Sequence, residues 1–484
     1  MGESQLKSAE LSIVEESIDA TISSLVSFFI GLAFLIILSF WLSVDVIGQF
    51  FFLYSIVLVC VQIPKGIGIA VRKRASEHNS NQSKYFWGGL VLIIPVLLGM
   101  LVALFGVYYA VSYLLPFQVS VLALLLVWSM IVTIGLKEYV RYYLAGCGEP
   151  GLAERVRVWV GDGGYLVLTL VGLWMYPSLE TVLAMKSAGP ILAIGVLVWL
   201  SSTSLVTPSK AVYTELLEFM KWSIPTNMLN DIYHRFDTLV LGFLVGTIAV
   251  GYYDSSVRVA AFGWSLAFGV SLASNVKISG LHEMGDSIRA VSEKIIVLSS
   301  LWTLPMLLIL IYNSEFVLTV ILGEEFVGAT GYLIGLGVIM LTQGYTLQFE
   351  AILNGIDTPR ITTKYSIVSV VTNVLTAPVL ILLFGGIGVV YSTVLSEGIR
   401  IGLYQRYIKS TQGYMLLPEG AIRQFQLFGC VFGVVGLVYL WLNMTGGFWF
   451  VISTSLILIL FYIPLYVYSA DFRDIVNEIC DIFL

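Results

Sequence analysis

Ionisable and amide side chains occur inside the long apolar stretches of this sequence, where a charge is costly and usually faces a partner or a water-filled cavity. Arginine and lysine in such a cavity suit a phosphate or diphosphate, which cannot cross hydrocarbon unpaired. Carboxylates there suit a cationic substrate or a coupling cation. We therefore predict a polar cavity that is mixed in charge but locally basic. Its predicted lining residues are Lys65, Lys137, Arg141, Asn227, Asp231, His234, Arg235, Asp237, Arg258 and Glu350.

The spacing of these residues favours helices that present them on one face. Lys137 and Arg141 are four apart, and polar residues recur every three to four positions over residues 227–237. Such a stripe on a membrane helix needs water or partners, which favours a cavity. Other interpretations stay open for single residues. Lys137 and Arg141 can extend to the membrane surface, His234 can be a hydrogen-bonded packing residue, and Arg258 can pair with the acid four residues before it.

The composition requires that these residues lie in a membrane protein. Of 484 residues, 58% are hydrophobic and 12% charged, whereas a soluble domain has roughly 25% charged residues. The mean hydropathy of +0.92 excludes a soluble enzyme or nucleic-acid-binding protein. Continuous apolar runs such as 90–103 favour transmembrane helices over the alternating strands of a β-barrel. We predict fourteen spans, at 18–42, 45–70, 86–112, 119–145, 153–175, 181–204, 222–245, 248–276, 293–313, 327–353, 363–384, 387–408, 421–443 and 447–469.

The distribution of lysine and arginine predicts the orientation, because basic loops stay in the cytoplasm. Nineteen of the 25 basic residues fall in loops and termini on one side, five fall inside spans, and Lys186 alone is placed on the other side. Both termini are therefore expected in the cytoplasm. The N-terminal segment 1–17 is mixed in character, so we expect no cleaved signal peptide. The four cysteines have neither metal-ligand nor redox spacing, and we expect no metal, no cofactor and no catalytic residue.

The sequence contains an internal repeat. The fourth span ends in LAGCGEP and the tenth in LNGIDTP, and the offset between Gly146 and Gly355 is 209 residues. The second and eighth spans open on similar segments around Gly48 and Gly251, at an offset of 203. Spans one to six and seven to twelve are therefore interpreted as two parallel copies of one six-helix unit, with chance similarity of glycine-rich helices as the alternative. Two such lobes are typical of alternating access.

The repeat sets the predicted domain organisation. An N-lobe occupies 18–204, a cytoplasmic linker 205–221 and a C-lobe 222–410, followed by two extra helices and a cytoplasmic tail at 411–484. The sequence has no phosphate loop for ATP hydrolysis and no segment that resembles a channel filter. The glycine-rich segment 161–165 is interpreted as a site of close helix packing.

The seventh and eighth spans, WSIPTNM…RFDTLVLGFLVGTIAVGYYDSSVRVA, resemble the polysaccharide and lipid-linked oligosaccharide flippases of the MOP superfamily. The matching positions are Pro225, Asp237, Gly242, Gly251 and Tyr252. A second matching segment contains Asn373, Pro378, Gly385, Gly386 and Gly388. The resemblance implies a MATE-like all-α fold of about fourteen transmembrane helices. It also implies a carrier that turns a polyprenyl-phosphate- or diphosphate-linked sugar from the cytoplasmic to the external leaflet of the cell membrane.

The resemblance further implies a basic central cavity, carried here by Arg141, Arg235 and Arg258. Nearby acids keep open an alternative from the same superfamily, a cation-coupled drug antiporter using Asp231, Asp237 or Glu350. A membrane-embedded glycosyltransferase would need a large polar loop, and the longest external stretch, 312–328, offers little beyond three glutamates. The expected partners are a lipid-linked sugar phosphate, membrane lipids and glycan-assembly enzymes, but not nucleic acid.

Overall fold

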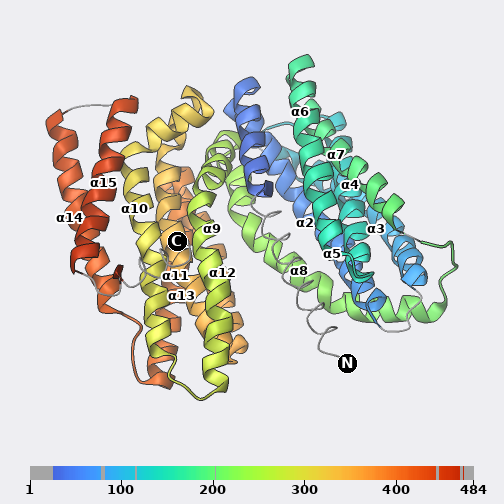
Figure 1. Ribbon diagram of the computed structural model, residues 1–484. Coiled ribbons are helices and arrows are strands. Elements are labelled where there is room, and N and C mark those ends of the chain that lie inside the picture. Colours follow the sequence, from blue (N-terminus) through green and yellow to red (C-terminus); the bar gives the residue numbers. More distant parts are fainter. Residues whose placement is uncertain are drawn as a thin grey trace. The chain divides into compact units, whose positions relative to one another are not determined.

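The computed structural model describes residues 26–77, 82–114, 117–201, 203–442, 446–468 and 472–473, and within them the regular structure is helical (Figure 1). After an apolar helix at Val26–Trp41, the long helices are α2 Val44–Ala75, α3 Gln82–Val111, α4 Val121–Gly146, α6 Gly163–Met175, α7 Leu179–Leu200, α8 Lys210–Leu244, α9 Thr247–Glu283, α10 Arg289–Leu322, α11 Thr330–Gly355, α12 Pro359–Phe384, α13 Gly388–Gln412, α14 Glu419–Leu442 and α15 Gly446–Tyr468. The short elements are η1 Ser112–Leu114, α5 Pro150–Arg155, the π-helix η2 Val156–Asp162, η3 Glu324–Ala329 and η4 Gly385–Ile387.

Ten helical stretches in the described part are long and apolar enough to cross a membrane. One of them, Pro359–Gln412, is 54 residues long and contains both α12 and α13. α8 and α9 are not among the ten, and Val26–Trp41 is apolar but shorter. Each predicted span overlaps one of the helices above. The prediction of an all-α multi-pass membrane protein is confirmed, and the predicted number of fourteen spans is approximate.

Local sequence explains where several helices begin and end. Ser120 and Ser178 precede α4 and α7, and each side-chain oxygen accepts a hydrogen bond from the backbone three residues later. Gly323 and Gly413 end α10 and α13 with positive φ angles of 101° and 78°, a conformation that glycine adopts at low cost. The prolines predicted inside spans, such as Pro64, lie inside helices, as membrane proteins tolerate.

The chain separates into two compact units, Met1–Asp254 and Ser255–Leu484, and the division falls within α9. In the first unit α2 packs against α4, α7 and α8. Glycines permit this close packing: a Cβ on Gly135 would lie 2.7 Å from a ring carbon of Pro64, and a Cβ on Gly48 would lie 1.8 Å from the carbonyl oxygen of Thr247. Close helix packing was also predicted for residues 161–165, and a Cβ on Gly189 would lie 2.8 Å from the carbonyl oxygen of Gly161.

In the second unit α11 packs against α10 and α13, and α12 packs against α13. The last two helices, α14 and α15, lie along α10. Asn313 of α10 accepts a hydrogen bond from Ser453 of α15 at 3.0 Å, and Tyr462 of α15 donates to the carbonyl oxygen of Leu301 at 3.1 Å.

The chain termini and the lobe boundaries are the features on which the predictions stay open. The N-terminal segment 1–17 and Cys480 lie outside the described residues. The predicted lobe boundaries stay predictions. In the region predicted as the linker 205–221, residues 203–209 are non-helical and α8 begins at Lys210.

Candidate functional site

A ring of six charged side chains lies in the first unit, where α4 meets α5 and η2. Three cations alternate with three carboxylates, and we call this set the six-charge ring. Its members in order are Lys137, Glu138, Arg141, Glu154, Arg157 and Asp162, and the last contacts the first.

Each carboxylate of the ring bridges two cations. Glu138 lies 3.4 Å from the ammonium of Lys137 and 2.7 Å from the guanidinium of Arg141. Glu154 lies 3.0 Å from Arg141 and 2.6 Å from Arg157. Asp162 lies 2.8 Å from Arg157. The ring closes through Lys137 and Asp162 at 3.9 Å, its longest contact.

Local helix geometry explains why these residues converge. In α4 the spacing of three residues places Glu138 and Arg141 on the same side of the helix. Pro150 occupies the first turn of α5, where a missing backbone N–H costs nothing. The π-helix η2 then brings residues five apart onto one face, so that Arg157 donates to Asp162 at 2.8 Å. π-Helical turns occur frequently at functional sites.

The six-charge ring is neutral as a whole and only partly covered. The side chains of Arg141, Glu154 and Arg157 are 21%, 19% and 20% exposed, whereas Lys137 is 8% exposed. The ring therefore has an accessible edge formed by Arg141, Glu154 and Arg157 and a buried corner at Lys137. Chemically, the accessible edge presents two guanidiniums that can hold an oxyanion.

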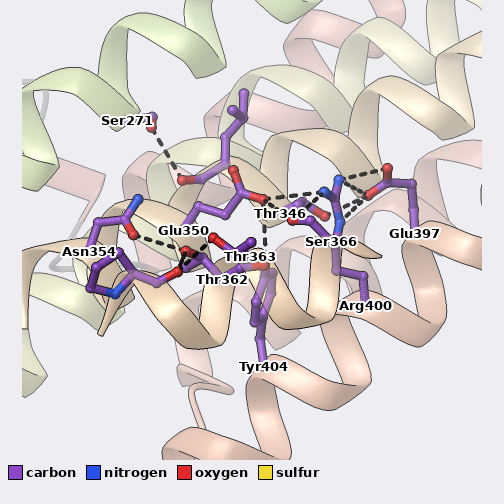
Figure 2. Close-up of polar contacts among 12 residues, drawn as sticks. Ser271, Thr346, Glu350, Asn354, Thr362, Thr363, Ser366, Glu397, Arg400 and Tyr404 are labelled. Atoms are coloured by element: carbon purple, nitrogen blue, oxygen red, sulfur yellow. Dashed lines mark hydrogen bonds and ion pairs between the residues drawn. The ribbon is translucent and has the colours of Figure 1, made fainter. Parts of the chain in front are cut away.

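A second polar network lies in the second unit, on α11, α12 and α13 (Figure 2). Arg400 lies between two carboxylates, 2.6 Å from Glu397 and 3.2 Å from Glu350. Nε and Nη2 of Arg400 donate to Glu397, and Nη1 donates to Glu350. We call Glu350, Glu397 and Arg400 the α13 triad.

Hydroxyl groups surround the α13 triad, as Figure 2 shows. Tyr404 donates to Glu350 at 3.1 Å, and Thr346 donates to Glu397 at 2.8 Å. Ser366 of α12 lies 3.5 Å from Glu350 and accepts from Arg400 at 3.4 Å. With both carboxylates ionised the triad carries one net negative charge, because two acids share one guanidinium.

The two networks occupy equivalent places in the repeat. Glu350 and Arg141 differ by 209 positions, as do Thr346 and Lys137, and this is the offset that relates the two LxGxxxP segments. The third pair at this offset is Ser366 and Arg157. Each of these six residues takes part in its network. The two repeats therefore place ionic networks at matching positions but with different charges.

The polar residues predicted on α8 lie in several environments. Asp237 is buried and accepts a hydrogen bond from Tyr253 at 2.7 Å. Asp231 and Arg235 are half-buried, and His234 is exposed with its ring near that of Tyr233. The side chain of Asn227 lies outside the described part of the structure.

Besides Arg235, two further predicted cations lie outside the networks. Lys65 of α2 follows Pro64 and is half-buried, and Arg258 of α9 is half-buried in the second unit. The structure thus joins Lys137 and Arg141 in one network and places Glu350 in another. A single cavity lined by all ten predicted residues stays a prediction.

Sequence reasoning missed the partners that complete both networks. Arg157 and Arg400 belong to the nineteen basic residues predicted in cytoplasmic loops and termini, but they lie in η2 and α13, and Arg400 is buried. A usable signal was present: each of these arginines follows an acid by three residues, Glu154 and Glu397, which is the spacing of an ion pair on one helix face.

Lys186, the one basic residue predicted on the external side, has a buried and aromatic environment, and its side of the membrane stays a prediction. Lys186 lies within α7 and is buried. Its ammonium lies 3.0 Å from the ring centre of Tyr165, 4.8 Å from that of Phe34 and 5.3 Å from that of Tyr54. Aromatic ring faces attract a desolvated cation, so this cage explains how a membrane helix accommodates a lysine.

No group of three or more histidine, cysteine, aspartate and glutamate side chains in the described residues has the geometry to hold a metal ion. Cys147, between α4 and α5, is a free thiol. Burial raises the pKa of this thiol above its usual range, and a hydrogen bond with Tyr143 opposes the shift.

Comparison with solved structures defines the class of fold. The lipid II flippase MurJ in an inward closed conformation superposes with a TM-score of 0.73 at 13% identity, covering 96% of this chain and 100% of that one. An inward-facing multidrug resistance MATE family transporter of the MOP superfamily gives 0.63 at 14% identity, covering 80% and 96%. The chain therefore has the fold of MOP-superfamily transporters.

Comparison of sequences identifies particular relatives. The chain is 26% identical over 380 residues to the probable low-salt glycan biosynthesis flippase Agl15 of Haloferax volcanii, which covers 74% of this chain and 76% of that protein. It is 25% identical over 197 residues to the probable flippase AglR of the same organism, covering 40% and 41%. The family model described as polysaccharide biosynthesis protein matches residues 160–330. These findings confirm the predicted resemblance to MOP-superfamily flippases.

Proposed function

We propose that this protein moves a polyprenyl-phosphate- or diphosphate-linked sugar or oligosaccharide from the cytoplasmic to the external leaflet, for cell-surface polysaccharide or glycoprotein assembly. The observation that carries the proposal is the convergence of Lys137, Arg141 and Arg157 within a transporter fold. The ring is neutral as a whole, but the two guanidiniums on its accessible edge can hold an oxyanion, which suits a diphosphate better than a cationic drug. The flippase relatives support the same substrate class.

The proposed mechanism is alternating access between the two repeats. The charged headgroup enters from the cytoplasmic leaflet, while the lipid tail stays among the hydrocarbon chains because a polyprenyl chain has no polar group to hydrate. The protein acts as a carrier and not as an enzyme. We place it in the cell membrane with both termini in the cytoplasm, and its partners are the lipid-linked substrate, membrane lipids and glycan-assembly enzymes.

The test is to locate the substrate after the gene is deleted. Lipid-linked sugars should accumulate on the cytoplasmic leaflet, measured by their protection from a membrane-impermeant glycosidase added outside intact cells. Reintroducing the gene should restore access. Arg141→Gln and Arg258→Ala should fail to restore it although the proteins fold. The exposed Arg423 provides the control, since Arg423→Ala should restore it fully. Normal leaflet distribution in the deletion strain would overturn the proposal.

A second function, a cation-coupled drug antiporter, is favoured by one observation. The α13 triad carries an excess carboxylate, and such a group can bind a proton or cation. Deletion would then leave glycolipids unchanged and raise sensitivity to cationic dyes. If the protein is an antiporter, a strain that carries only the Glu350→Gln variant should show the same sensitivity to cationic dyes as the deletion strain. If the protein is a flippase, neither strain should show it.

A further inference from the structure

Glu154 holds the position that an external anion would take between two arginines of the six-charge ring. We propose that Arg141 and Arg157 form the site that receives the substrate's phosphate, and that Glu154 is a built-in competitor which the phosphate displaces. This inference rests on the proposed function for the identity of the lipid. The chemistry of the site, a diphosphate oxyanion held by two guanidiniums, follows from the geometry.

The contacts of Glu154 are those expected of a bound oxyanion. One carboxylate oxygen accepts from Arg141 Nη1 at 3.0 Å. The other accepts from Arg157 Nε at 2.7 Å and contacts Nη2 at 2.6 Å. Guanidinium groups bind carboxylate and phosphate with the same forked geometry, so one can replace the other without moving the arginines far.

Accessibility identifies Glu154 as the carboxylate that an arriving ligand meets. It lies with Arg141 and Arg157 on the accessible edge of the ring and is its most exposed carboxylate, at 19% against 16% for Asp162 and 14% for Glu138. The opposite corner of the ring, Lys137, is buried. A phosphate therefore reaches the two arginines first, and its remaining charge is drawn toward the lysine behind them.

Connectivity explains why Glu154 yields before the other two acids. Glu138 lies on the same helix as both of its cations. Asp162 lies on the same π-helix as Arg157 and also accepts a hydrogen bond from Ser27 at 3.3 Å. Glu154 shares the continuous helical stretch Pro150–Met175 with Arg157, but its contact with Arg141 crosses to α4 and has to break when the two helices separate.

Charge explains why the competitor is needed. Without Glu154 the ring would hold three cations and two carboxylates, and an uncompensated charge among these partly buried side chains is costly. Glu154 neutralises the ring when no substrate is bound, and the phosphate does so when it is. When the substrate leaves, Glu154 returns to the arginines and thereby aids release of a ligand that would otherwise bind too tightly to be transported.

The test measures phosphate binding to the purified full-length protein in detergent micelles. Isothermal titration uses two probes, inorganic pyrophosphate and farnesyl diphosphate. Glu154→Gln removes the competing charge and should raise the affinity for both probes about tenfold or more, since a hydrogen bond to a charged group contributes roughly one to two factors of ten. Glu138→Gln is the matched control, because it removes the same charge from the less accessible side, and its gain should be smaller. Adding Arg157→Gln to Glu154→Gln should abolish the gain.

A larger gain for farnesyl diphosphate than for pyrophosphate supports a lipid-linked ligand, and equal gains support a site for any diphosphate. Equal affinity of Glu154→Gln and the unaltered protein for both probes overturns the inference. Glu154→Asp, which keeps the charge but shortens its reach, should give an intermediate gain and covers the case in which the glutamine variant does not fold. The proposed function fails separately: it falls if gene deletion leaves the leaflet distribution normal, whatever the binding results.

Discussion

Replacing Arg400 with methionine isolates the energetic role of the cation in the α13 triad. Methionine keeps an unbranched side chain of comparable length but removes the charge and all five donors. Two carboxylates would then face each other without their shared guanidinium. Glu397 is the more sensitive of the two, because its side chain is 0% exposed and cannot reach water.

The expected loss follows from the burial of the pair. Removing one partner of a buried ion pair costs about 3–5 kcal/mol, because the other charge stays buried without compensation. Arg423 and Glu419 provide an internal comparison at the same separation of 2.6 Å, but both are exposed. An exposed pair contributes roughly 0.2–1 kcal/mol. Arg400→Met should therefore destabilise the protein several times more than Arg423→Met.

The assay is reversible unfolding of the purified protein in mixed micelles of increasing denaturing detergent, followed by tryptophan fluorescence. The double variant Arg400→Met with Glu397→Gln should recover more than half of the loss, because it removes the stranded charge. Equal losses for Arg400→Met and Arg423→Met would show that burial of the charge does not set the cost. No recovery on neutralising Glu397 would show that the loss comes from packing.

Three further predictions concern the first unit. Gly48→Ala should destabilise the protein by about 1–3 kcal/mol, because the added methyl group would overpack against the carbonyl oxygen of Thr247. Gly99→Ala is the control and should be neutral, because its methyl group meets open space. Equal melting temperatures of the two variants in thermal unfolding would contradict the packing account. Lys186→Met should lose about 0.5–2 kcal/mol of cation–π attraction and still fold. Lys186→Glu should not fold, because the ring faces repel a carboxylate. A well-folded Lys186→Glu variant in size-exclusion chromatography would argue against the aromatic cage. A variant whose only cysteine is Cys147 should react slowly with maleimide at pH 7 and faster as the pH rises, because a raised pKa keeps the thiol protonated; a rate equal to that of a free thiol at pH 7 would speak against its burial.

The fold was predictable from the sequence because hydrocarbon leaves few choices. Apolar runs of about 20 residues must form helices, since no other open structure satisfies its backbone in lipid. The number of spans was less certain where a turn is short: α12 and α13 are separated only by η4, Gly385–Ile387.

The candidate site was predictable only in part. Lys137, Arg141 and Glu350 could be identified because they interrupt apolar runs, and all three take part in ion pairs. Arg157 could not be identified in this way, because it lies near the start of the predicted span 153–175 and does not interrupt an apolar run. The π-helix that turns it toward Asp162 changes the residue spacing over seven positions, too few for a periodic pattern to reveal. The packing of the helices determines which acids complete each network, and this packing cannot be predicted from a single sequence.

The two networks share three positions at the same offset of 209 residues but differ in chemistry. At the equivalent positions 141 and 350 the chain has an arginine in one repeat and a glutamate in the other. The surrounding groups compensate in opposite ways: Arg141 is met by two carboxylates, whereas Glu350 is met by one guanidinium and the hydroxyls of Tyr404 and Ser366. A site that is neutral only with its own glutamate in place is suited to exchange one anion for another. A site with an excess carboxylate is suited instead to gain a cation or a proton. If both repeats contribute to transport, the first is therefore the one that binds the phosphate. The double variant Arg141→Glu with Glu350→Arg should abolish flipping, because an arginine at position 350 would not create a phosphate site in the second repeat.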